Sequence, residues 1–383
     1  ESQFVNGLEH MIKVYSRDDG AAINYEYDSV GNRTKKVLRT LSGNMKEYEY
    51  YYYSGTNRLK DYTVNGKNAY AYVYDDAGNL VKKGNKYSIE GENVTFTETE
   101  GQGVEYYEYE YNLQNRLSQV KKNGEVIAEF RYDADGMRIK AEEQLEEEET
   151  SRSTYFVYGY SGKVLLEESS GFGDTSEGSS DDTETIVTYT SYIYAFAKTF
   201  AKVDGVIDTA TIATAEISYF HYDNLGSTRL MTNSAGEITF DQDYLPFGGD
   251  LPGVGQVEVQ NDSGERYKYT GQKEAVSIGL YYYGARYYDP EIGRFITEDT
   301  YEGKLALPQS QNLYVYVMNN SLRFVDPTGN VVEEYDFDMD LDLSPSEYDF
   351  SLTDFKFKIP DTWEMIYEGV SFREFNDYNV LRI

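Results

Sequence analysis

Along much of the chain, apolar or aromatic residues alternate with polar ones over short stretches, which is the two-residue period of β-strands. Glu47–Tyr53, Tyr70–Tyr74 and Val104–Tyr111 show this pattern most clearly, and helical periodicity does not accompany them. Tyrosine, with an apolar ring and a polar tip, suits such half-buried strands. The pattern therefore predicts an all-β fold built from short consecutive strands.

The strand-like stretches end in a recurring motif that begins with Tyr-Asp and has Gly at its fifth place. The clear copies are residues 27–33, 74–80, 132–138 and 222–228, and the weaker ones are 53–59, 111–117 and 158–164. Asp in this place accepts hydrogen bonds from backbone N–H groups two residues on, and Gly takes a positive φ. Each motif thus predicts a hairpin tip. Because one hairpin cannot bury its apolar face, we expect a continuous spiral of stacked hairpins.

Three stretches interrupt this rhythm. Glu142–Thr150 and Glu167–Thr185 are rich in acidic or small polar residues and are interpreted as solvated surface loops. Acidic oxygens suit hard cations, but the second stretch lacks a fixed ligand spacing, so a surface loop is favoured over a calcium or partner site. Ser191–Ile217 is compatible with strands or with a short helix, and its type stays open.

Composition narrows the function classes. The 383 residues include 41 Tyr and no Cys, and 67 acidic against 35 basic residues give a formal net charge of −32. This charge disfavours binding of nucleic acid by the shell, and the lack of Cys excludes disulfides and thiolate metal sites. We find neither a transmembrane-length apolar run nor a signal peptide, and we expect the chain to be a fragment or processed product.

The pattern changes beyond Tyr269. The distinctive residues are Tyr269-Thr270-Gly271-Gln272, Gly279–Pro290, Gly293-Arg294-Phe295-Ile296, Asn312–Tyr316, Asn319-Asn320 and Asp326-Pro327-Thr328-Gly329. This stretch, Tyr269–Gly329, resembles the RHS repeat-associated core domain of bacterial polymorphic toxins, wall-associated proteins and the C components of insecticidal toxin complexes. With the Tyr-Asp repeats, the resemblance covers roughly residues 20 to 329.

The resemblance implies a hollow β-cocoon. Residues 1–250 would form the shell, 251–329 the RHS core domain that closes one end, and 330–383 a short variable segment held inside. It also implies a secreted or cell-surface location, a secretion or delivery module and a target-cell surface as partners, and the chain's own C-terminal segment as cargo. The variable part normally carries the activity.

In the toxin members the core domain resembles an intramolecular aspartyl protease that cuts just beyond Asp-Pro-x-Gly. Such chemistry needs two neighbouring carboxylates that share one proton. By position the candidates are Asp299 and Asp326, with Arg294 as an electrostatic or structural helper and a cleavage region at Gly329 and Asn330. Two departures weaken the match, because Thr300 stands where Pro is usual and Asn330 where an aliphatic residue is usual. The alternative is that both aspartates only cap turns.

Other chemistry is poorly supported. With only His10 and His221, the chain offers no His-based triad or multi-histidine metal site, and His221 is interpreted as a strand residue. We predict no cofactor and no metal site. Tyr335–Leu343 alternates as a strand with an anionic face, and a calcium loop there would lack its Gly at Leu341. Two further functions stay open, namely a non-enzymatic adhesive or glycan-facing module, as in teneurin YD repeats, and a tail that is itself a small toxin.

Overall fold

The computed structural model describes residues 2–4, 11–16, 22–40, 42–97, 103–145, 151–159, 162–172, 185–195, 198–208, 211–251, 264–304 and 308–334. Within these ranges the regular structure consists of β-strands and three short 3-10 helices, which confirms the all-β prediction. No helix in these ranges has the length and apolar character needed to cross a membrane.

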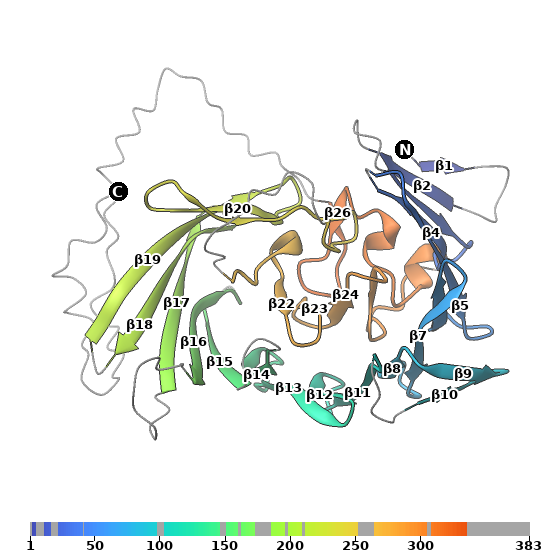
Figure 1. Ribbon diagram of the computed structural model, residues 1–383, viewed down its shortest axis with the longest axis horizontal. Helices are drawn as coiled ribbons and strands as arrows, with labels where there is room; N and C mark the ends of the chain where they lie inside the picture. The colour runs from blue at the N-terminus through green and yellow to red at the C-terminus, as the bar shows by residue number, and fades with distance from the viewer. Residues whose placement is uncertain are drawn as a thin grey trace, which may run out of the picture.

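One antiparallel sheet of 19 strands, counted over the described residues, contains the repeats. Its strands are β1 (Ser2–Phe4), β2 (Met11–Ser16), β3 (Ala22–Tyr27), β4 (Arg33–Arg39), β5 (Met45–Tyr52), β6 (Leu59–Val64), β7 (Lys67–Tyr74), β8 (Leu80–Gly84), β11 (Tyr106–Tyr111), β12 (Leu117–Lys122), β13 (Glu125–Tyr132), β14 (Arg138–Gln144), β15 (Ser151–Tyr158), β16 (Val164–Phe172), β17 (Thr185–Ala195), β18 (Lys198–Asp208), β19 (Thr211–Tyr222), β20 (Thr228–Asn233) and β21 (Ile238–Asp241). Each pairs with the next in this order, and β8 pairs with β11 because β9 (Tyr87–Glu90) and β10 (Asn93–Phe96) form a hairpin of their own. The sheet is a curved wall (Figure 1), and no pairing of described strands joins β21 to β1.

The hairpin tips have the predicted chemistry. Oδ1 of Asp28 accepts hydrogen bonds from the backbone N–H groups of Val30 (3.1 Å) and Asn32 (2.8 Å), and Gly31 has φ +84°. The bond to the fourth residue on recurs at 2.8 Å at Asp75, Asp133 and Asp223. The motif is therefore a self-contained turn whose geometry is fixed by its own side chain.

The curvature of the wall begins at these tips. A register shift occurs just before the end of the first strand of each hairpin, as between Glu26 and Tyr27 or between Arg131 and Tyr132. The same shift is found at β5, β7, β11, β15 and β19. Further shifts lie beside turns at the opposite edge, between β6 and β7, β12 and β13, β18 and β19, and β20 and β21. Because β-bulges bend a strand and increase its twist, their repetition along the array curves the sheet.

Tyrosine hydroxyls tie successive hairpins together. The hydroxyl of Tyr132 donates to the backbone carbonyl of Leu117 (2.7 Å), and that of Tyr158 to Arg138 (2.8 Å). Equivalent bonds of 2.7–2.8 Å join Tyr52 to Arg33, Tyr111 to Leu80, Tyr194 to Val164, Tyr222 to Thr199 and Tyr244 to Thr228. Each acceptor lies at the start of an earlier strand, where a buried carbonyl needs a donor. This recurring bond gives a physical reason for tyrosine rather than phenylalanine at these places.

A second unit, here called the core-end segment (residues 264–304 and 308–334), lies on the concave side of the wall (Figure 1). Its elements are η1 (Tyr269–Gly271), β22 (Lys273–Ala275), β23 (Leu280–Tyr282), β24 (Tyr287–Asp289), β25 (Arg294–Phe295), η2 (Pro308–Gln311), η3 (Val317–Asn319), β26 (Phe324–Val325) and β27 (Glu333–Glu334). Tyr283, Tyr288, Phe295 and Tyr316 form its buried aromatic centre, with the rings of Tyr288 and Tyr316 4.7 Å apart. The rings pack in tilted or edge-to-face pairs, and side chains of this size each bury a large apolar area.

The two acidic stretches interpreted as loops are partly strands, so this prediction was wrong for the residues described. Glu143 lies in β14 and Glu167 in β16, and they are only 3% and 6% exposed. Each is paired with a cation of the core-end segment, Arg266 at 3.1 Å from Glu143 and Lys273 in contact with Glu167. Buried carboxylates require such partners, and these partners lie more than 100 residues away along the chain. Residues 146–150 and 173–184 lie outside the described residues.

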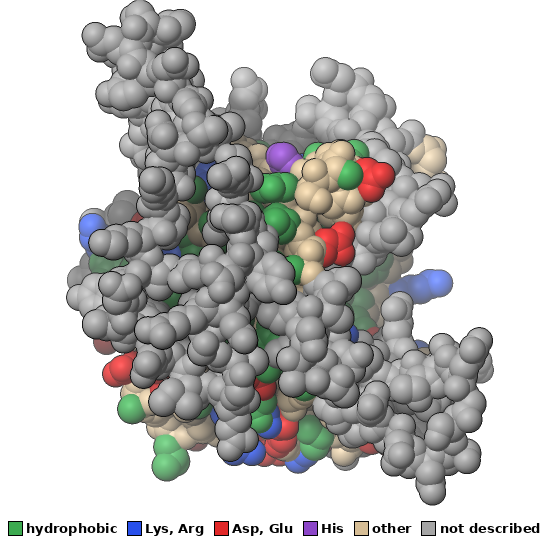
Figure 2. All heavy atoms as spheres, turned by 90° about the vertical axis from the view of Figure 1, so that its left-hand side faces the viewer, with side chains coloured by type: hydrophobic (Ala, Val, Ile, Leu, Met, Phe, Trp, Pro, Cys, Tyr) green, Lys and Arg blue, Asp and Glu red, His purple; other side chains and the backbone are tan. Residues whose placement is uncertain are grey.

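Ser191–Ile217, whose type was open, falls in strands β17, β18 and β19. His221 also lies in β19, which confirms it as a strand residue, and its Nε2 is 3.0 Å from the hydroxyl of Thr232. Acidic, basic and hydrophobic side chains are interspersed on the described surface in Figure 2. The predicted anionic strand of the tail, Tyr335–Leu343, lies outside the described residues and stays a prediction.

Candidate functional site

The structure brings Asp299 and Asp326 to one guanidinium group. Nη2 of Arg286 lies 2.7 Å from Oδ2 of Asp299 and 3.5 Å from Oδ2 of Asp326. The two carboxylate side chains are 16% and 3% exposed. The pair predicted from the sequence is thus adjacent in space, but a shared cation, rather than a shared proton, links its members here.

Asp326 is held by the turn that follows it. Its Oδ1 accepts hydrogen bonds from four successive backbone N–H groups, at Thr328 (3.3 Å), Gly329 (2.8 Å), Asn330 (3.1 Å) and Val331 (3.0 Å). Burial raises the pKa of Asp326, and the hydrogen bond from Val331 and the charge of Arg286 act in the opposite direction. The protonated form of this carboxyl group therefore persists to a higher pH than that of an ordinary aspartate.

Arg286 completes the site from the other side. Its Nε donates to the carbonyl of Gly329, its Nη1 donates to the carbonyl of Leu313 (2.9 Å), and its guanidinium carbon lies 3.7 Å from the ring centroid of Phe295. The Leu313 carbonyl also accepts the N–H of Asp299 (2.9 Å), which fixes both side chains to one backbone point. Burial lowers the pKa of Arg286, while the two aspartates oppose this change.

The peptide bond between Gly329 and Asn330 is held at both ends. The guanidinium of Arg286 donates to its oxygen, and the carboxylate of Asp326 accepts from its N–H group. A cationic donor at a carbonyl oxygen stabilises the negative charge that develops there when a nucleophile adds. A carboxyl group beside the amide nitrogen is placed to protonate it when the bond breaks. The arrangement is chemically suited to peptide hydrolysis.

Arg294, the predicted helper, lies elsewhere. From β25 its guanidinium donates to the carbonyl of Asn57 (2.6 Å), the hydroxyl of Tyr52 (3.2 Å) and the side-chain oxygens of Asn32 (3.3 Å) and Asn312 (3.2 Å). Three of these partners belong to hairpins of the wall. Arg294 therefore joins the core-end segment to the wall, which is the structural one of its two predicted roles.

Arg286 was missed by sequence reasoning. It stands inside the tyrosine-rich run Gly279–Pro290, and it is 5% exposed. A charged residue within an apolar run needs a buried partner of opposite charge, so this position carried a usable signal. The side-chain oxygen of Asn330, the atypical residue after Gly329, is buried without a hydrogen-bond partner among the described residues.

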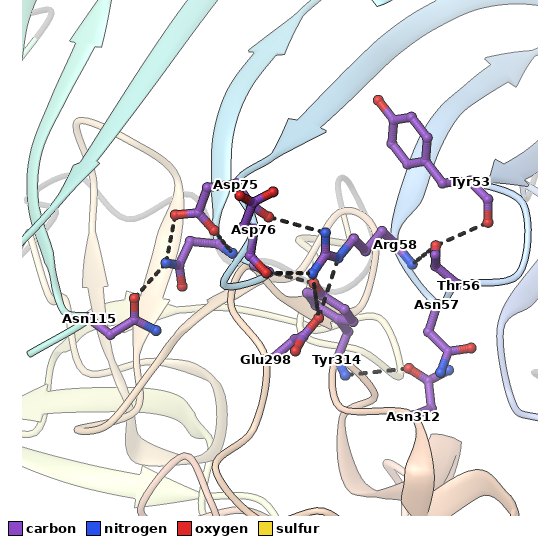
Figure 3. Close-up of polar contacts among 12 residues, drawn as sticks. Tyr53, Thr56, Asn57, Arg58, Asp75, Asp76, Asn115, Glu298, Asn312 and Tyr314 are labelled. Atoms are coloured by element: carbon purple, nitrogen blue, oxygen red, sulfur yellow. Dashed lines mark hydrogen bonds and ion pairs between the residues drawn. The ribbon is translucent and has the colours of Figure 1, made fainter. Parts of the chain in front are cut away.

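Hairpin tips of the wall hold Glu298, the residue immediately before Asp299 (Figure 3). Oε1 of Glu298 accepts from Nε (3.3 Å) and Nη2 (3.2 Å) of Arg58 and from the hydroxyl of Tyr314 (3.0 Å). Arg58 in turn donates to the carbonyls of Asp75 (3.1 Å) and Asp76 (3.3 Å), so one guanidinium joins two tips to Glu298. A Cβ atom on Gly78 would come within 2.3 Å of the Glu298 side chain, so this tip needs glycine for close approach as well as for its φ of +81°.

Arginines at the sixth or seventh place of other tips reach the core-end segment in the same way. Nη1 of Arg33 donates to the carbonyl of Ile292 (2.8 Å), Nη1 of Arg116 to the carbonyl of Gly284 (3.1 Å), and Nη1 of Arg138 to the hydroxyl of Tyr287 (3.0 Å).

In the described part of the chain, no group of three or more His, Asp or Glu residues is arranged to hold a metal ion.

No family model matches the chain. It is 26% identical over 327 residues to the tRNA3(Ser)-specific nuclease WapA of Bacillus spizizenii, a match that covers 85% of this chain and 12% of that protein. It is 36% identical over 120 residues to toxin subunit YenC1 of Yersinia entomophaga, which covers 31% of this chain and 12% of YenC1. A crystal structure of TcdB2-TccC3-TEV superposes with a TM-score of 0.47 at 20% identity, covering 86% of this chain and 18% of that one.

The chain thus spans 12% of the length of these two curated relatives. The match to WapA extends over most of the described wall and core-end segment, and a second WapA, the tRNA nuclease of Bacillus subtilis, is 27% identical over 327 residues. The chain is homologous to these toxin proteins, which confirms the predicted resemblance to the RHS/YD-repeat family.

Proposed function

We propose that this chain is part of an extracellular RHS-repeat shell that encloses and presents a C-terminal effector segment. The observation that carries the proposal is that the core-end segment lies on the concave side of the wall and leads directly into the C-terminal tail. The partners of the shell are then the chain's own C-terminal segment, a delivery module and a target-cell surface. Relatives that are toxin subunits support a secreted or cell-surface location.

The proposal includes one self-cleavage of the Gly329–Asn330 bond. Asp299 accepts a proton from a water molecule, and the oxygen of that water molecule adds to the carbonyl carbon of Gly329. Arg286 stabilises the negative charge on the carbonyl oxygen. The bond to nitrogen then breaks while protonated Asp326, whose pKa is raised by burial, donates a proton to the nitrogen of Asn330. The products are a new carboxyl terminus at Gly329 and a new amino terminus at Asn330.

Mass spectrometry of the purified full chain during long incubation tests the cleavage. We expect the wild type to split between Gly329 and Asn330, and the Asp299→Asn and Asp326→Asn variants to stay whole. Asp135→Asn is the matched control, because Asp135 is an exposed tip residue outside the site. A wild type that stays uncut would refute self-cleavage.

Size-exclusion chromatography of the cut chain tests the enclosure separately. We expect the C-terminal fragment to elute with the shell under native conditions and to separate from it only in denaturant. Free elution of the fragment would refute enclosure without affecting the cleavage result.

The adhesive alternative needs exposed tyrosine rings. In the strands whose exposure is described, most tyrosines are buried or half-buried, and Tyr51 (44%) and Tyr155 (46%) are the exposed ones. Most of the tyrosine content instead serves the hydroxyl bonds between hairpins and the aromatic clusters behind them. The wall is therefore better suited to enclosing a segment than to presenting a glycan-stacking face.

A further inference from the structure

We infer that Arg58 and Arg116, two arginines of the wall, are positioning residues for the self-cleavage site. They make cutting depend on assembly of the wall around the core-end segment. This inference rests on the proposed self-cleavage and adds its regulation. Both residues occupy the sixth place of a weaker tip motif, and their partners lie 240 and 168 residues away along the chain. Their contacts therefore form only when the wall and the core-end segment are together.

Arg116 acts on the side of the site that holds Arg286. It donates to the carbonyl of Gly284 (3.1 Å), and the next residue, Ala285, donates its N–H to the carbonyl of Thr328 (3.0 Å). Gly284 packs so closely on the cleavage loop that a Cβ atom there would lie 3.3 Å from the Thr328 oxygen. The bond from Arg116 thus fixes the short turn that sets Arg286 against the Gly329 carbonyl. Arg116 itself is not seen to contact the reacting peptide.

Arg58 acts on the side that holds Asp299. Its ion pair with Glu298 fixes the residue immediately before Asp299, and its bonds to the carbonyls of Asp75 and Asp76 fix the guanidinium itself. Figure 3 shows Arg58 between these tips and Glu298. Without Arg58, Glu298 would keep its bond from Tyr314 but lose its charged partner. A small displacement would then pass directly to Asp299 through the backbone.

A small cavity beside the site has the same dependence on the wall. Its volume is about 10 Å³, close to the space that one water molecule needs. It is lined from the wall by Arg116, Tyr111 and Tyr132, and from the core-end segment by Arg286, Tyr287 and Thr297. The cavity is partly open, and both units supply its lining, so it forms only when they are together. Through Arg286 it adds a second contact between the site and the wall.

The test is the first-order rate constant of cleavage, followed by mass spectrometry of full-length chains over a range of pH. We expect Arg116→Met and Arg58→Met to cut about 10- to 100-fold more slowly than the wild type, the range expected when reacting groups are displaced by about 1 Å. Arg116→Lys keeps a charged donor and should recover part of the lost rate. Arg131→Met is the matched control, because Arg131 is exposed on β13, and it should cut at the wild-type rate.

The rate constant per folded chain separates positioning from a loss of folded protein. Irreversibly misfolded chains lower the final extent of cutting, and a reversible folding equilibrium lowers the observed rate constant by the folded fraction. Each rate constant is therefore divided by the folded fraction measured by circular dichroism. Displacement of Asp299 or Arg286 lowers the rate constant itself, so we expect both Met variants to cut more slowly per folded chain at every pH tested. If these variants do not fold, Arg58→Lys and Arg116→Lys are judged by the same rate constant per folded chain.

The outcomes distinguish the two proposals. If the wild type cuts and both arginine variants cut at its rate with its pH profile, the inference is overturned and the self-cleavage stands. If the wild type does not cut, the proposed self-cleavage fails, and the inference fails with it.

Discussion

The buried ion pair between Glu167 and Lys273 gives the sharpest stability prediction. The two side chains are 7% and 6% exposed, and they join β16 of the wall to β22 of the core-end segment. Glu167 also accepts a hydrogen bond from the hydroxyl of Tyr267 (2.8 Å), and the ammonium group of Lys273 lies 4.9 Å from the ring centroid of Phe156. Burial acts to raise the pKa of Glu167, but attraction to Lys273 and hydrogen bonds from Lys273 and Tyr267 outweigh it, so the pKa is lowered.

Replacing Glu167 by alanine leaves the ammonium group of Lys273 buried without its anion. Breaking one side of a buried pair costs about 3–5 kcal/mol, mainly because the remaining charge is not compensated. We therefore expect Glu167→Ala to lower the free energy of unfolding by about 4 kcal/mol. The double variant Glu167→Leu/Lys273→Met removes both charges, and we expect it to lie within about 1–2 kcal/mol of the wild type.

Urea unfolding followed by circular dichroism of the β signal measures both changes at neutral pH. The matched control is Glu110→Ala, which breaks the exposed pair with Lys121 (2.6 Å, side chains 54% and 29% exposed) and should cost less than about 1 kcal/mol. Two results contradict the reasoning. One is a loss below about 1 kcal/mol for Glu167→Ala, and the other is a double variant as unstable as the single one.

Three further predictions concern the wall. Gly78→Ala should lower the free energy of unfolding by at least twice as much as Gly66→Ala. Both glycines have positive φ, but only at Gly78 would the added Cβ atom clash with the Glu298 side chain. Equal urea midpoints for the two variants would contradict this. For Gly66→Ala the left-handed backbone alone predicts about 1–2 kcal/mol. Tyr111→Phe should cost about 1–2 kcal/mol in the same assay, because it leaves the buried carbonyl it binds without a donor, and an unchanged midpoint would count against the role of the hydroxyl bonds. Burial lowers the pKa of Lys36 to about 8. Between about pH 8 and 10, Lys36 is therefore protonated in the unfolded chain but largely neutral in the folded one, so its contribution makes the free energy of unfolding rise with pH. Lys36→Met should flatten that rise, by up to about 3 kcal/mol in urea titrations at pH 7 to 10, and identical slopes for both proteins would exclude the effect.

The sequence predicted what depends on neighbouring residues. The tip around Asp28 and Gly31 is local, because the side chain and the backbone groups that it binds lie within four residues. Asp326 was found from its place in the Asp-Pro-Thr-Gly motif, and the backbone N–H groups that it binds follow it directly. The hydroxyl bond of Tyr158 was not predictable, because its acceptor belongs to a strand 20 residues earlier that only the fold brings close.

Buried charges were the main failure. Glu143 and Glu167 stand in acidic stretches, and such composition normally indicates solvent exposure. Their partners Arg266 and Lys273 lie on the other unit, so only the tertiary structure distinguishes a buried carboxylate from a solvated one. Arg286 was missed for the reverse reason, because nothing near it in sequence indicates that two aspartates converge on it.

The successive contacts between the wall and the core-end segment also let that segment set the number of hairpins in the wall. Arg33, Arg58, Arg116 and Arg138 each donate to a different acceptor on it. Further along the wall, Glu143 accepts from Arg266, Glu167 accepts from Lys273, and Lys202 pairs with Glu265. An array of similar hairpins has no intrinsic length, since one more or one fewer would repeat the same local contacts. The different partners on the core-end segment therefore determine how many hairpins the wall contains. Gain or loss of a single hairpin would bring every later wall residue of this series opposite the wrong partner.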